Sequence, residues 1–177
     1  FADLAGCDIV VEAVFEDRAV KADVTRKAEA VIAHSAIFAS NTSTLPISGL
    51  AEASARPANF IGLHFFSPVD KMPLVEIIRG QATSDECLAR AMDFVKAIRK
   101  TPIVVNDSRG FYTSRVFSTY VGEGLALLAE GVKPALIDNA GRMAGMPVGP
   151  LALADEVSLE LICLLYTSDA ADDSLRV

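Results

Sequence analysis

An alternation of short apolar runs with an amphipathic segment limits the fold of this chain more than any other feature of its sequence. Residues 7–14 read CDIVVEAV, a β-branched run typical of a buried strand. From Asp17 to about Ala33, apolar residues recur at helical spacing, which predicts a helix. Residues 36–39, AIFA, predict a second strand. A strand–helix–strand unit builds parallel sheets, so the predicted fold class is α/β, with ligands outside the carboxyl ends of the strands.

Two polar loops follow these predicted strands. Residues 15–17 (FED) contain Glu16, and residues 40–44 (SNTST) are hydroxyl and amide side chains. In this architecture such loops hold cofactor and substrate. Helix capping is the alternative for the second loop, because Pro46 would lie near the first turn of a short helix over residues 47–53. Capping explains some of these hydroxyls, but not why five polar residues follow one strand.

The stretch over residues 62–76, GLHFFSPVDKMPLVE, carries the clearest candidates for chemistry. We predict strands over residues 60–66 and 74–78, which bring His64 and Glu76 onto neighbouring strands. An imidazole titrates near neutral pH, and a paired carboxylate orients it and stabilises its charged form. Our hypothesis is that His64 is a general base and Glu76 its partner. The alternative is a core histidine beside a carboxylate that faces solvent.

The next segment continues the alternation of helix and strand. Thr83 and Glu86 form a capping-box signature for a helix that runs to about Arg99. Residues 103–105 predict a fifth strand. After Gly110 the pattern changes to consecutive helices, over residues 111–129, over residues 134–144 and from Gly149 onward. We therefore predict a domain boundary near residues 107–110.

Composition excludes several classes of function. The net charge of −7 argues against a nucleic-acid groove, which needs clustered Lys and Arg. No apolar run reaches the roughly 20 residues of a membrane span. Cys7, Cys87 and Cys163 are far apart and lack metal-ligand spacing. We expect free thiols, no metal site and a cytoplasmic location.

The two ends of the chain differ from the rest. The chain starts at Phe1 with no initiator Met and no signal-like segment, so we expect a fragment of a longer protein. Residues 163–172 resemble the translation of a sequencing adaptor. We therefore expect residues 163–177 to be a non-native tail and exclude them from predictions of the fold.

A set of motifs, in this order and spacing, resembles the 3-hydroxyacyl-CoA dehydrogenase family, and most closely the dehydrogenase part of bacterial multifunctional fatty-acid oxidation proteins. The motifs are VEAVFED (11–17), ASNTSTLPI (39–47), GLHFFSP (62–68), LVEII (74–78), RGFYTSR (109–115) and MPVGPLALAD (146–155). The resemblance implies the C-terminal part of a Rossmann-like NAD-binding domain over residues 1–108. A partial helical domain that dimerises is implied over residues 109–162.

The resemblance also implies roles for individual residues. His64 would take the proton from the 3-hydroxyl of the substrate while a hydride leaves C3 for NAD, and Glu76 would stabilise the resulting imidazolium. Ser43 would hydrogen-bond the reacting oxygen and lie beside the cofactor. Glu16 and Lys21 would lie along NAD. For Lys21 the alternative is a solvated lysine on a helix surface.

This chain departs from the family pattern at two positions and in one absence. Many relatives have Asn where this chain has Ser114, a substrate-site position, and Ser67, a cofactor-site position. Serine keeps hydrogen-bonding ability but has a shorter reach. The glycine-rich turn for the pyrophosphate and the acidic residue for the ribose would lie before Phe1. We expect the first βαβ half to be missing and the fragment to bind NAD poorly.

The leading hypothesis is an NAD-linked oxidoreductase that converts L-3-hydroxyacyl-CoA to 3-oxoacyl-CoA in fatty-acid β-oxidation. One alternative is a biosynthetic 3-hydroxybutyryl-CoA dehydrogenase that uses NADPH. Another is a non-catalytic structural homologue, against which His64, Glu76 and Ser43 count because packing requires none of them. The implied partners are an acyl-CoA substrate and a second copy or a multifunctional complex joined through the helical domain.

Overall fold

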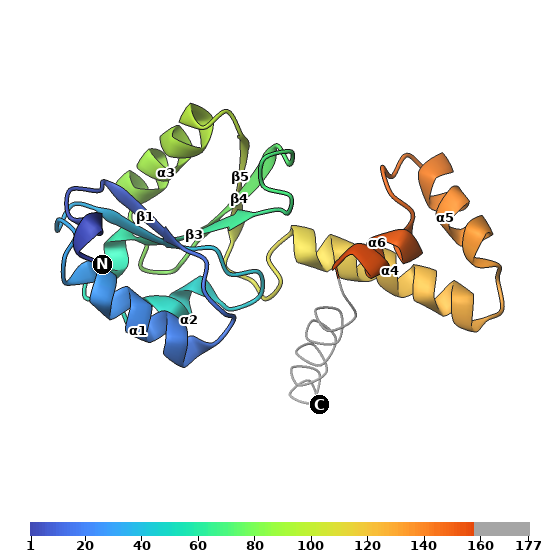
Figure 1. Cartoon of the computed structure of the whole chain (residues 1–177), viewed down its shortest axis with the longest axis horizontal. Coiled ribbons are helices and arrows are strands. Elements are labelled where there is room, and N and C mark those ends of the chain that lie inside the picture. Colours follow the sequence, from blue (N-terminus) through green and yellow to red (C-terminus); the bar gives the residue numbers. More distant parts are fainter. Residues whose placement is uncertain (158–177) are drawn as a thin grey trace. The chain divides into compact units, whose positions relative to one another are not determined.

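The computed structural model describes residues 1–157, and it divides the chain into two compact units. The first unit is Phe1–Tyr112, and the second begins at Thr113 (Figure 1). The expected non-native tail over residues 163–177 lies outside the described residues. Within the described part of the chain, no helix is long and apolar enough to cross a membrane.

The first unit is built on a five-stranded sheet whose spatial order follows the sequence. The strands are β1 (Ile9–Glu12), β2 (Ile37–Ser40), β3 (Phe60–Phe65), β4 (Leu74–Arg79) and β5 (Thr101–Asn106). Strands β1 to β3 run parallel, β4 is antiparallel to β3, and β5 is parallel to β4. The direction reverses at β4 because residues 66–73 are too few for a crossover connection, which needs about a dozen residues. The α/β fold class is confirmed.

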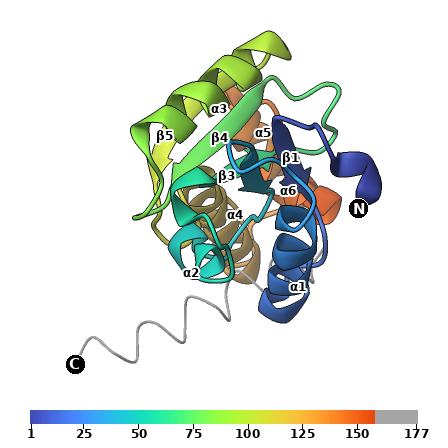
Figure 2. The same ribbon diagram turned by 90° about the vertical axis from the view of Figure 1, so that its left-hand side faces the viewer.

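Helices cover both faces of the sheet. Helices α1 (Arg18–Glu29) and α2 (Ile47–Ala51) lie on one face, and α3 (Asp85–Ala97) lies on the other (Figures 1 and 2). Phe38 and Phe60 pack toward α1 and α2 with their ring centroids 5.7 Å apart. Ile37 and Ile61 belong to the core on the α3 side. Burial on both faces explains why these strands are continuous apolar runs rather than alternating ones.

Two predicted helix ends are wrong, and tertiary contacts explain both. The cap of α3 is Ser84, whose hydroxyl accepts from the Cys87 main-chain nitrogen at 3.1 Å. The Thr83 hydroxyl instead donates to the Phe60 carbonyl at 2.7 Å inside the core.

Helix α1 ends at Glu29 rather than near Ala33. The guanidinium of Arg56 donates to the Glu29 carbonyl, which would otherwise accept the next helical hydrogen bond.

The second unit is helical in its described part, with α4 (Thr113–Ala129), α5 (Pro134–Met143) and α6 (Pro150–Val157). Val121 of α4 and Ala154 of α6 form its small core. Gly124 allows Pro150 to approach α4, because a β-carbon at that position would lie 2.7 Å from the proline ring. Asp138 accepts from the Leu151 main-chain nitrogen at 2.9 Å, in the first turn of α6.

Candidate active site

Four polar side chains lie on the face of the sheet that α1 and α2 cover. Along a strand, residues two apart share a face. Val10, Phe38 and Ile78 pack toward α1 and α2. Each of them is two residues away from a polar residue in the same strand, and these polar residues are Glu12, Ser40 and Glu76. By the same count His64 shares the face of Phe60. Glu12, Ser40 and His64 lie at or near the carboxyl ends of β1, β2 and β3, where α/β sheets bind ligands.

His64 and Glu76 are directly opposite each other on β3 and β4. Nδ1 of His64 lies 2.8 Å from Oε2 of Glu76, and the side chains are 8 % and 0 % exposed. The alternative of a solvent-facing carboxylate is therefore wrong. The other Glu76 oxygen accepts from the Tyr112 main-chain nitrogen at 3.1 Å. In this arrangement Glu76 can accept a hydrogen carried on Nδ1 of His64, which leaves Nε2 as the proton acceptor of the ring.

Aromatic rings border the imidazole. The ring centroid of Phe66 lies 4.6 Å from that of His64, and the ring centroid of Phe111 lies 6.2 Å away. Phe111 is buried and has a φ of 50°, a left-handed conformation that bulky residues rarely adopt. No role for Phe111 was predicted from the sequence. The adjacent Gly110, with a φ of 68°, was the available signal, because glycine marks places where the backbone turns left-handed.

Lys21 and Glu12 form a buried ion pair at the carboxyl end of β1. Nζ of Lys21 lies 3.0 Å and 3.1 Å from the two Glu12 oxygens. Lys21 is only 2 % exposed, so the alternative of a solvated helix lysine is wrong. Glu12 also accepts from the Ser40 hydroxyl and, at 3.0 Å, from the Val14 main-chain nitrogen. No role for Glu12 was predicted, although an acid inside an apolar strand was the available signal.

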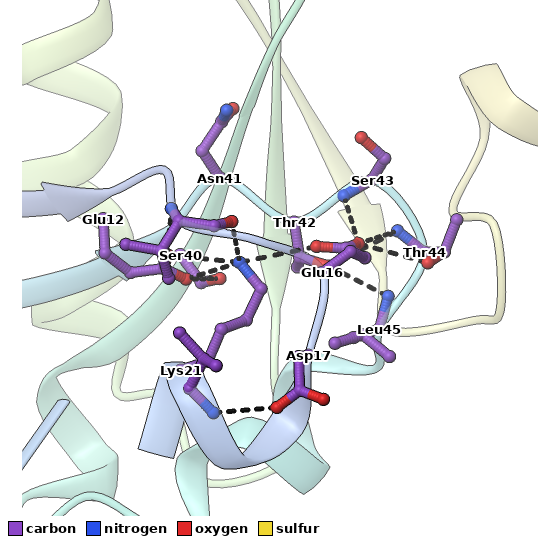
Figure 3. A network of polar contacts seen from close by, with 12 residues as sticks. Glu12, Glu16, Asp17, Lys21, Ser40, Asn41, Thr42, Ser43, Thr44 and Leu45 are labelled. Carbon is purple, nitrogen blue, oxygen red and sulfur yellow. Dashed lines mark hydrogen bonds and ion pairs between the residues drawn. The ribbon is translucent and has the colours of Figure 1, made fainter. Parts of the chain in front are cut away.

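Glu16 holds the loop that follows β2 (Figure 3). Its Oε1 accepts from the hydroxyls of Thr42 and Thr44 and from the main-chain nitrogens of Ser43, at 2.9 Å, and Thr44, at 3.0 Å. Its Oε2 lies 3.4 Å from Nζ of Lys21. Burial raises the pKa of the Glu16 carboxyl, but the hydrogen bonds, led by that from Thr42, and the charge of Lys21 hold the pKa below its ordinary value.

The structure thus brings Glu16, Lys21 and Ser43 together. The main-chain nitrogen of Ser43 faces Glu16, whereas its hydroxyl points away from that carboxylate (Figure 3). The hydroxyls of this loop do not cap α2. That helix is capped by Asp107, whose carboxylate accepts from the main-chain nitrogens of Ile47 and Ser48, both at 2.7 Å. The capping interpretation of the loop is therefore wrong.

The two serine departures lie in different units. Ser67 is exposed and lies just beyond the carboxyl end of β3. Ser114 is half-buried in the first turn of α4, in the second unit. Among the described residues there is no group of three or more His, Cys, Asp or Glu side chains that could hold a metal ion.

Comparisons with known proteins identify the family of this chain. Residues 1–108 match the family "3-hydroxyacyl-CoA dehydrogenase, NAD binding domain", and residues 110–170 match "3-hydroxyacyl-CoA dehydrogenase, C-terminal domain". The chain is 51 % identical over 154 residues to the fatty acid oxidation complex subunit alpha of Shewanella halifaxensis, covering 87 % of this chain and 22 % of that protein. The counterpart from Shewanella frigidimarina is 47 % identical over 161 residues, covering 91 % and 23 %. The chain thus spans less than a quarter of the length of these curated relatives.

Solved structures are similar as well. The crystal structure of M. tuberculosis FadB2 has a TM-score of 0.89 at 32 % identity, covering 99 % of this chain and 62 % of that one. The structure of (S)-3-hydroxybutyryl-CoA dehydrogenase PaaH1 from Ralstonia eutropha has a TM-score of 0.88 at 38 % identity, covering 93 % and 59 %.

Proposed function

The chain belongs to the 3-hydroxyacyl-CoA dehydrogenase family, and we propose that the full-length protein oxidises L-3-hydroxyacyl-CoA to 3-oxoacyl-CoA with NAD in fatty-acid β-oxidation. The observation that carries this proposal is the buried pair of His64 and Glu76, with 2.8 Å between Nδ1 and Oε2. An imidazole with its Nδ1 hydrogen fixed by a carboxylate is a general base at Nε2.

In the proposed reaction, His64 transfers the proton and Glu76 stabilises the charge that forms. Nε2 of His64 takes the proton of the 3-hydroxyl as the C–O bond becomes a carbonyl. Bound NAD supplies the acceptor for the hydride that leaves C3. The charge that forms on His64 lies against Glu76, which is fully buried, so the attraction is strong in that low-dielectric surrounding. The proton then passes from His64 to water when the product leaves.

We propose that Ser43 contacts the reacting oxygen of the substrate and that Ser114 contributes a separate substrate contact. The Ser43 hydroxyl would donate to the reacting oxygen, and its backbone is held in place by Glu16 at 2.9 Å. Ser114 would hydrogen-bond the substrate from the start of α4. A fixed donor at the position where charge develops lowers the barrier without reorganising during the reaction.

The rim at the carboxyl ends of β1 to β3 fits a nicotinamide cofactor. Dinucleotides bind at this position in doubly wound sheets. Glu16 is partly exposed there, with its side chain at 25 %, and Ser67 is exposed next to β3. Glu16, Ser43 and Ser67 would contact NAD directly. Lys21, which is buried, would act on the cofactor site through Glu16.

The two sequence regions would serve different tasks. Residues 1–108 would form the NAD-binding domain and residues 109–162 the helical domain that completes the acyl-CoA site and joins a second copy or a multifunctional complex. Exposed apolar side chains in the second unit, Leu136 at 61 % and Met143 at 88 %, support an interface there. We propose a cytoplasmic location.

An assay that follows NADH absorbance with the full-length protein tests the proposal. We expect NADH formation from L-3-hydroxyacyl-CoA, little from the D isomer, and less with NADP than with NAD. Glu76→Gln should lower kcat by about 10²-fold or more while the protein remains folded. A preference for NADPH in the reverse direction would favour the biosynthetic alternative. No turnover of any 3-hydroxyacyl-CoA would favour the non-catalytic one.

A further inference from the structure

Asn41 connects the ends of three strands next to the proposed base. It directly follows β2 in the sequence. Its side-chain Oδ1 accepts from the Phe65 main-chain nitrogen at 2.8 Å. Its own main-chain nitrogen donates to the Glu12 carbonyl at 2.9 Å, which fixes Asn41 to β1. Phe65 is the residue after His64, so this side chain anchors β3 beside the imidazole.

The anchor lies beyond the regular pairing of β2 with β3. Paired residues of these strands run from Phe38 with Phe60 to Ser40 with Gly62. His64 is further along β3, where β4 continues to pair on the other side, with His64 opposite Glu76. On the β2 side, the Asn41 amide oxygen thus accepts the hydrogen bond from the Phe65 main-chain nitrogen that a backbone carbonyl would accept in a longer strand pair. In Figure 3 its side chain points away from Lys21 and Glu16, so its contact is separate from that ion-pair network.

Resting on the proposed role of His64, we propose that Asn41 is a positioning residue. Its acceptor oxygen holds the Phe65 amide, and through it the backbone of His64, in the place from which Nε2 reaches the substrate hydroxyl. A displacement of about 1 Å at a reacting group costs up to about 10²-fold in rate. The contact needs only an acceptor at this position, and the NH₂ group of the amide takes no part in it.

Two substitutions separate the acceptor from the bulk of the side chain. Asn41→Leu has a similar size and no acceptor, whereas Asn41→Asp keeps an oxygen at the same reach. A matched control is Ser48→Ala, which removes a side-chain oxygen that accepts from the Gln81 main-chain nitrogen at 2.9 Å. Gln81 follows β4, which is antiparallel to β3, so this contact lies near the amino end of β3, whereas His64 is near its carboxyl end.

In the full-length protein we expect Asn41→Leu to lower kcat by about tenfold or more, with KM for both substrates within about threefold of the wild type. Asn41→Asp should stay within about threefold in kcat, and Ser48→Ala should match the wild type. Asn41→Leu added to His64→Gln should cause no further loss, because no base remains to be positioned. Thermal unfolding checks that each variant is folded, and Asn41→Ala replaces the Leu variant if that one is not.

The inference is overturned if the Leu or Ala variant keeps the wild-type kcat, or if Asn41→Asp falls as far as Asn41→Leu. It is also overturned if Asn41→Leu lowers the residual rate of His64→Gln by the same factor as in the wild type. Failure of the proposed function is a different result: His64→Gln itself would then keep the wild-type rate.

Discussion

Nζ of Lys21 lies 3.0 Å from Oε1 of Glu12, and the two side chains are only 2 % and 3 % exposed. Removing one partner of such a pair leaves an uncompensated buried charge, which costs about 3–5 kcal/mol. We predict that Lys21→Met lowers the free energy of unfolding by about this amount. Glu12→Gln should lower it by less, because Lys21 keeps a second carboxylate, Glu16, at 3.4 Å. The double variant should lose less than the sum of the two, because neither charge then remains unpaired. Urea unfolding measures all three.

Helix α1 carries its own control for this prediction. Lys27 forms an ion pair with Asp23 at 2.6 Å, but the side chains are 57 % and 53 % exposed. Lys27→Met should therefore cost at most about 0.5 kcal/mol. Equal losses for Lys21→Met and Lys27→Met would contradict the buried ion pair.

The contribution of Glu16 to stability should depend on pH. Its pKa is lower in the folded protein than the ordinary value of 4.5, so the ionised carboxylate stabilises the fold above that pH. This contribution is lost as the pH falls through the folded pKa. We predict that Glu16→Gln has a lower melting temperature than the wild type at about pH 7, and that the difference shrinks toward about pH 3. A difference that is the same at both pH values would contradict the hydrogen-bonded carboxylate.

The buried thiol of Cys87 should be unreactive in the native protein. Burial raises its pKa to about 11, so at about pH 8 only about one molecule in a thousand carries the reactive thiolate. Cys7 is only partly buried. Iodoacetamide labelling followed by peptide mass spectrometry should modify Cys7 first and Cys87 only after urea is added. Equal labelling of both in the native state would exclude the packing of α3 described above.

Local patterns were sufficient for most of the fold. The predicted strands over residues 60–66 and 74–78 differ from β3 and β4 by a single residue at one end, because an apolar run between turn residues marks a buried strand. The pairing of His64 with Glu76 could also be predicted, since a short connection makes consecutive strands neighbours and places these residues near its two ends.

Contacts between distant segments could not be predicted from the same patterns. Asp107 caps α2 from about sixty residues away, while nearer hydroxyls that looked like caps bind Glu16. Lys21 faces the sheet although a helix lysine usually faces water, because Glu12 offers a buried partner that only the packing of α1 on β1 brings close. Asn41 appeared in the sequence as one of several polar loop residues, and its bond to Phe65 depends on how far β2 pairs with β3.

The dyad of His64 and Glu76 is tested most directly by the rate of a single turnover. The full-length protein and its His64→Gln variant are mixed rapidly with L-3-hydroxyacyl-CoA and NAD, and NADH absorbance is followed. Loss of a general base should lower the hydride-transfer rate by about 10²- to 10⁴-fold, with the dissociation constants of substrate and NAD within about threefold of the wild type. A His64→Gln rate within about threefold of the wild-type rate would contradict the assignment of His64 as the base.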